Sequence, residues 1–335
     1  MRFIFYVILS IAFVFAGCSN ENPGTKTDLE FSSNGTMIRG TLFSPSGQGP
    51  FPAVVLVHGA APTSRKEYGE YVRELLLRDI AVFTYDKRGF GHSGGDMWVS
   101  GFRDLAFDAI YAAEKIGSTP NIDADRVGLM GFNQGGRVAE YADSLSAIPA
   151  FVVSISSPPV SPQEQSEYFV RQIVAAQSGS DEVAGRFNRF MEAYLSYVRE
   201  PVNYPRVVEL RDSIISQDDM RFLEDQFRLS DFEYITVPDS LPSWRNIRLN
   251  PSARDYFYNP FPQVERTETP HLFIFGGQDQ INPIMLGAQR LEPLIQSGKV
   301  ELKSYLEADH NMREEQRFPM GYFDDIARWI KNSKP

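Results

Sequence analysis

The feature that most constrains the fold is an alternation of short apolar runs with stretches of helical spacing. The runs Ala53–Val57 and Ile80–Tyr85 are almost continuously apolar, as expected for strands that are buried on both faces. Helical spacing follows them over Tyr68–Arg78 and Phe102–Ile116. Parallel strands need such crossover helices, so the alternation predicts an α/β fold with a mostly parallel sheet flanked by helices.

The same alternation of strands and helices continues further along the chain. Strands are predicted at Arg126–Met130, Phe151–Ile155, His271–Phe275 and Val300–Leu306, and helices at Gly135–Leu145, Pro283–Gln296 and Gly321–Lys331. Near the start, Asn34-Gly35 lies between Leu29–Ser33 and Thr36–Phe43, which is a strong hairpin signal. We therefore expect an antiparallel hairpin at the beginning of the sheet.

A long helical stretch interrupts the alternation after Ser157. From about residue 163 to 250 there is no convincing strand, and helical spacing marks Glu182–Glu200 and Arg206–Ser216. An insertion between two strands of an open sheet usually covers the carboxyl ends of the strands, where ligands bind. We predict a helical lid at about 160–255, with a purely structural excursion as the alternative.

Composition narrows the class of protein further. Of the 335 residues, 42% are hydrophobic and 23% are charged, which suits a globular chain and excludes a disordered one. The formal net charge is −10, which would be repelled by a phosphate backbone, and no basic patch offsets it. Nucleic acid is therefore not an expected partner.

The N-terminus has the features of an export signal. Arg2 precedes an apolar run, and Phe15-Ala16-Gly17 leads to Cys18, the single cysteine of the chain. This arrangement resembles the bacterial lipoprotein signal, in which such a cysteine receives lipid. It implies a signal peptide at 1–17, lipidation of Cys18, a polar tether over 18–28, and a domain held on a membrane of the bacterial cell envelope. A plain cleaved signal with a chance cysteine is the alternative.

Several loops that follow the predicted strands carry recognisable motifs. They are His58-Gly59-Ala60, Asp86-Lys87-Arg88-Gly89, Gly131-Phe132-Asn133-Gln134-Gly135, Gly277-Gln278-Asp279 and Ala308-Asp309-His310. In this order they resemble the α/β-hydrolase family, in particular esterases and acyl-peptidase-like members that have a helical lid. The resemblance implies an α/β-hydrolase domain over 29–335 and a small-molecule acyl substrate or ligand.

One residue departs from the pattern of that family. The family places a nucleophilic serine at the centre of G-x-S-x-G, on a sharp turn from strand to helix, and here Asn133 stands at that position. An amide nitrogen is a poor nucleophile because its lone pair is delocalised, so an acyl-enzyme on Asn133 is not expected. The turn usually requires a positive φ, which asparagine tolerates well, so the fold should be preserved.

The resemblance implies roles for other residues around this position. Asp279 would orient His310, and the backbone N–H groups of Ala60 and Gln134 would form the oxyanion hole. His58, Lys87 and Arg88 are interpreted as residues that support loops. The four histidines of the chain lack metal-ligand spacing, so neither a metal nor another cofactor is predicted.

A second match to G-x-S-x-G occurs at Gly91-His92-Ser93-Gly94-Gly95. It lies several residues beyond its strand and does not open a helix at once, so Ser93 is interpreted as part of a structural loop.

Two functions remain open from the sequence. In the first, the chain hydrolyses ester, thioester or amide bonds, with His310 activating water or with Asn133 converted to a nucleophilic aspartate. In the second, it is a non-catalytic ligand-binding protein of the envelope, and Asp279 and His310 are remnants of a lost activity.

Overall fold

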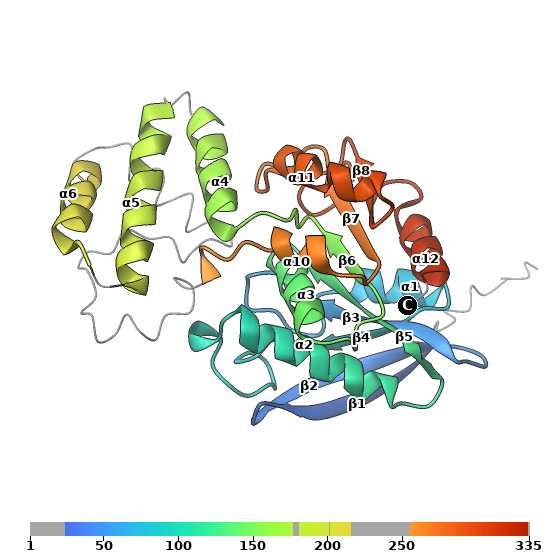
Figure 1. The fold of residues 1–335 in the computed structure, drawn as a ribbon. Coiled ribbons are helices and arrows are strands. Elements are labelled where there is room, and N and C mark those ends of the chain that lie inside the picture. The colour runs from blue at the N-terminus through green and yellow to red at the C-terminus, as the bar shows by residue number, and fades with distance from the viewer. Residues whose placement is uncertain (1–23, 177–180, 201, 216–254, 334–335) are drawn as a thin grey trace, which may run out of the picture.

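The computed structural model describes residues 24–176, 181–200, 202–215 and 255–333 of the chain (Figure 1). Within this part, eight strands form one sheet in the order β1-β2-β4-β3-β5-β6-β7-β8. The strands are β1 (Gly24–Ser33), β2 (Thr36–Pro45), β3 (Phe51–Val57), β4 (Ala81–Tyr85), β5 (Ile122–Phe132), β6 (Val152–Ile155), β7 (His271–Gly276) and β8 (Val300–Tyr305). Strands β3 to β8 pair with one another in parallel, whereas β4 pairs antiparallel with β2 on its other side. This mostly parallel sheet confirms the predicted fold class.

The predicted hairpin is present as the antiparallel pair β1 and β2. Asn34 and Gly35 both have positive φ, 48° and 83°, and they join β1 to β2. Pairing extends back to Gly24, which lies opposite Pro45. The predicted tether over 18–28 is therefore wrong for its last five residues, 24–28, because their backbone groups pair with β2. The predicted signal peptide and Cys18 lie outside the described residues.

Helices cover both faces of the sheet (Figure 1). Their bounds are α1 (Gly69–Leu76), α2 (Phe102–Gly117), α3 (Gln134–Leu145), α10 (Phe261–Arg266), α11 (Ile284–Gln296) and α12 (Tyr322–Asn332), with a short 3₁₀ turn, η1, at Met97–Val99. Helices α2 and α3 pack on one face, whereas α1 and α12 pack on the other. Burial on both faces explains why the central strands are so uniformly apolar.

The described part of the insertion between β6 and β7 is mostly helical. It contains α4 (Pro162–Ala176), α5 (Asp181–Arg199) and α6 (Tyr204–Ile215), which stand together beside one end of the sheet (Figure 1). These helices share a small apolar core that includes Phe169, Phe187 and Phe190. The helical character predicted for this segment is thus confirmed up to residue 215.

The strand order determines where a site can form. Strand β3 lies between β4 and β5, so the chain reverses its direction of travel across the sheet at β3. Crevices form at such reversals, outside the carboxyl ends of the strands. The loops after β3 and β5, which hold Ala60 and Asn133, meet at this point. No helix within the described residues is long and apolar enough to span a bilayer.

Candidate active site

Asn133 occupies a strained turn between β5 and α3. Its backbone has φ 49° and ψ −113°, and its N–H donates to the carbonyl oxygen of Ile155 at 3.0 Å. Glycine is required at both flanking positions because other backbone segments lie very close to them. A Cβ on Gly131 would overlap the carbonyl of Gly135, and a Cβ on Gly135 would overlap the carbonyl of Val57. The sharp turn expected from the motif is therefore present with asparagine at its apex.

The structure brings Asn133, His310 and Asp279 together from three separate loops. Nδ1 of His310 lies 2.9 Å from Oδ2 of Asp279, and Nε2 lies 3.2 Å from Nδ2 of Asn133. The Asp279 side chain is fully buried, whereas that of His310 is 16% exposed. Because a carboxylate can only accept, Nδ1 carries the proton and Nε2 presents its lone pair to position 133.

Gln165 of α4 determines which way the Asn133 amide points. Its Nε2 donates to Oδ1 of Asn133 at 3.0 Å. The Asn133 nitrogen is thereby directed to His310, as the histidine lone pair requires. The amide thus donates to the histidine in the position where a serine hydroxyl would donate its proton.

A second asparagine, Asn282, holds the acid–base pair in place. The carboxylate of Asp279 accepts the backbone N–H groups of Ile281 and Asn282 at 2.8 and 2.9 Å. The Asn282 amide donates to the carbonyl of Ser156 at 2.8 Å, and the Ser156 hydroxyl donates to the carbonyl of His310 at 2.6 Å. The sequence analysis did not predict these supporting contacts. The position of Asn282, three residues after Asp279, could have indicated its role.

The loop after β3 forms the opposite wall. Lys87 donates to the carbonyl oxygens of Gly59 and Ala60 at 2.7 and 2.8 Å, which supports the conformation of this loop. Gln134 is the first residue of α3, so its N–H has no acceptor within the helix. Ala60 and Gln134 line the same cavity as Asn133, which is where oxyanion-hole donors would have to lie.

The interpretation of His58 and Ser93 as structural residues is confirmed. His58 is buried, and its Nε2–H donates to the carbonyl of Tyr85 at 2.6 Å. Burial lowers the pKa of His58 to about 3, so the ring is neutral. Ser93 is also buried, and its hydroxyl accepts the backbone N–H of Arg39 at 3.0 Å.

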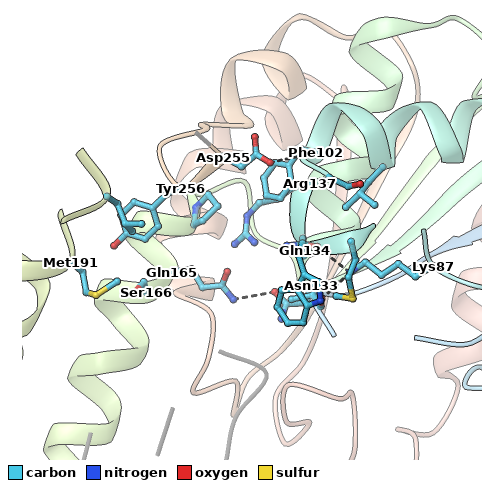
Figure 2. Close-up of a pocket in the computed structure, with 17 residues that line it drawn as sticks. Lys87, Phe102, Asn133, Gln134, Arg137, Gln165, Ser166, Met191, Asp255 and Tyr256 are labelled. Atoms are coloured by element: carbon cyan, nitrogen blue, oxygen red, sulfur yellow. Dashed lines mark hydrogen bonds between the residues drawn. The ribbon is translucent and has the colours of Figure 1, made fainter. Parts of the chain in front are cut away.

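A cavity of about 170 Å³ opens beside Asn133, between the sheet and the helical insertion (Figure 2). The apolar part of its wall comes from Met97, Trp98, Phe102, Leu105, Pro162, Met191, Leu195 and Tyr256. The polar part is formed by Lys87, Ser100, Asn133, Gln134, Arg137, Gln165, Ser166 and Asp255. An apolar cavity with a few polar groups beside a histidine–aspartate pair suits a small organic ligand.

Solved structures resemble this chain over almost its whole length. The esterase Pf2001 of Pyrococcus furiosus is 16% identical with a TM-score of 0.60, and 93% of this chain and 92% of that one are covered. The chain has the α/β-hydrolase fold. The acylaminoacyl peptidase of Pyrococcus horikoshii has the same fold, at 15% identity and a TM-score of 0.56, over 94% of this chain and 42% of that one.

Sequence comparisons match parts of the chain. The family model for serine aminopeptidase, S33, matches residues 48–196, a segment that includes Asn133 and Gln165. Esterase FrsA of Escherichia coli O81 (strain ED1a) is 31% identical over 139 residues, which is 41% of this chain. The chain spans about a third (33%) of the length of that relative.

Proposed function

We propose that this α/β-hydrolase-fold protein binds small carboxylic esters or related acyl compounds in the cavity beside Asn133. On this proposal Asp279 orients His310, the N–H groups of Ala60 and Gln134 bind the acyl oxygen, and the esterase-type relatives reflect a shared class of ligand. The observation that carries the proposal is the unbroken hydrogen-bonded chain from Asp279 through His310 to position 133.

Turnover in this sequence is slow because the acyl-enzyme route is closed. Asn133 has no hydroxyl proton for His310 to remove, and its amide nitrogen is a weak nucleophile. Hydrolysis must instead proceed by direct attack of a water molecule that His310 deprotonates. In a serine protease stripped of its triad, roughly 10³–10⁴-fold acceleration over water remained from binding and the oxyanion hole.

Asn133→Ser tests the proposal, because it supplies the missing hydroxyl at the same turn. We expect hydrolysis of a short p-nitrophenyl ester to rise by about 10²-fold or more, since removing the serine of a complete triad costs up to ~10⁶-fold. The double variant Asn133→Ser, His310→Ala should lose that gain. If the serine variant is folded and no faster than the native chain, or if its rate does not depend on His310, the proposal fails.

Ligand binding without turnover is the second candidate, and one contact favours it. The Asn133 amide donates to Nε2 of His310, so both ring nitrogens of the histidine already have partners. A water molecule must displace that amide before it can be activated. A native chain that binds esters but shows no hydrolysis dependent on His310 would support this candidate.

We also propose that the protein is a lipid-anchored domain at the bacterial envelope. This proposed location depends on the sequence from Arg2 to Cys18 alone.

A further inference from the structure

Arg137 is a buried cation in the wall of the cavity. It is the fourth residue of α3, one helical turn from the N-terminal end of the helix, which begins after Asn133. The residue is only 1% exposed. Its Nε donates to the carbonyl of Val160 at 2.8 Å, whereas Nη2 has no hydrogen-bond partner in the described part of the chain. Figure 2 shows the guanidinium beside the cavity, among the side chains that line it.

No carboxylate of the described residues forms an ion pair with Arg137. Glu164 pairs with Arg290 at 2.5 Å. Asp255, the acidic residue of the cavity wall, accepts the backbone N–H of Phe102 at 2.7 Å. The carboxyl of Glu140 accepts the hydroxyl of Ser154 at 2.9 Å.

The state of charge around Arg137 follows from burial. Burial raises the pKa of Glu140 to about 8, so at neutral pH this carboxyl is mostly protonated and offsets little of the guanidinium charge. Glu164 also attracts the guanidinium, but its carboxylate is paired with Arg290. Burial lowers the pKa of Arg137 to about 10, which keeps it positively charged at neutral pH. A buried charge with an unused donor is unfavourable unless something pairs with it.

We infer that the cavity binds acyl compounds that carry a carboxylate, and that Arg137 binds this carboxylate. This inference depends on the proposed function, since it names the class of acyl ligand for the same cavity. The acyl carbonyl would lie at Asn133 and the carboxylate one helical turn away. A short aliphatic chain between them would pack against Phe102, Leu105 and Leu195. Half-esters of short dicarboxylic acids have this form.

The test compares two probes of nearly equal shape, monomethyl glutarate and dimethyl glutarate, by calorimetric titration of the native chain. We expect the half-ester to bind at least about 10-fold more tightly, because a charge-assisted guanidinium–carboxylate pair is among the strong hydrogen bonds. Arg137→Met should remove the preference. Arg171→Met, which removes an exposed arginine from α4, should keep it.

Each outcome decides the inference. Equal binding of the two probes, tighter binding of the diester, binding of neither at millimolar concentration, or a preference that survives Arg137→Met would overturn it. If Arg137→Met does not fold, the comparison of probes on the native chain still decides the matter. Hydrolysis by Asn133→Ser separates the two proposals: a half-ester preference with an inactive serine variant refutes only the hydrolase proposal. Activity on both probes without preference refutes only the role of Arg137.

Discussion

At the scale of the residue, Asn133 is held by its backbone and by both polar atoms of its side-chain amide. Its positive φ fits the turn, its oxygen accepts from Gln165, and its nitrogen donates to His310. Few residues other than asparagine combine tolerance of positive φ with one donor and one acceptor at this reach. The substitution therefore leaves the geometry of the turn intact while it removes the reactive hydroxyl.

The closeness of strand and helix at this turn leads to a prediction for Gly131. Its added Cβ would meet the backbone of Gly135 and Gly136, which cannot move without displacing α3. Gly131→Ala should therefore lower the free energy of unfolding by about 3 kcal/mol or more, measured by urea denaturation. Gly69→Ala is the matched control, because its Cβ would meet open space and the stability should hardly change. Equal stability of the two variants would contradict the packing described here.

Part of the site can be predicted from sequence and part cannot. Asn133, Asp279 and His310 follow strands of a parallel sheet, so their order along the chain is enough to bring them to one edge. Arg137 follows Asn133 by four residues in the sequence, a spacing that indicates closeness at the start of a helix. Gln165 comes from the insertion, and nothing in its sequence surroundings indicates that it reaches Asn133.

At the scale of the element, buried strands and amphipathic helices are predictable because their apolar periods are local. The strands β3, β4, β6 and β7 were predicted within a residue or two at each end. Strand β5 begins at Ile122 rather than Arg126, because Ile122 pairs with Phe51 ahead of an irregularity in the register. Helix α10 was not predicted, since six residues around Pro262 carry too little helical pattern.

One ion pair joins α4 of the insertion to α11. Arg290 of α11 binds both carboxylate oxygens of Glu164 in α4 and donates to the carbonyl of Pro159 at 3.1 Å. Both side chains are partly exposed, which limits the value of the pair. Arg290→Ala should lower the free energy of unfolding by about 1–2 kcal/mol, measured by urea denaturation.

Arg328 provides the control for that prediction. It pairs with Asp325 on the exposed surface of α12, so Arg328→Ala should cost less than about 0.5 kcal/mol. Equal losses in the two variants would show that the Arg290 pair does not anchor α4.

At the scale of the whole molecule, the buried Glu140 links stability to pH. Its pKa is about 8 in the folded chain and near its ordinary 4.5 when unfolded, because burial penalises the charged form. Between these values the folded state holds a proton that the unfolded state releases, so this residue makes stability fall as pH rises. Its contribution approaches ~1.4 kcal/mol per pH unit.

Glu140→Gln should remove that contribution. Urea denaturation at pH 5 and pH 8 should show the variant gaining stability relative to the native chain by a few kcal/mol at the higher pH. The exposed Glu114→Gln should change neither value by more than about 0.5 kcal/mol. A difference between Glu140→Gln and the native chain that does not vary with pH would refute the burial argument.

The central claim is that residue 133 occupies the turn where this fold places a nucleophile, but its side chain is not nucleophilic. Intact-protein mass spectrometry after treatment with an alkyl fluorophosphonate, which phosphonylates serines activated by histidine, tests it most directly. We predict one adduct on Asn133→Ser, located at residue 133, and none on the native chain or on Asn133→Ser, His310→Ala. A folded serine variant that stays unlabelled, or a native chain that is labelled at residue 133, would contradict the claim.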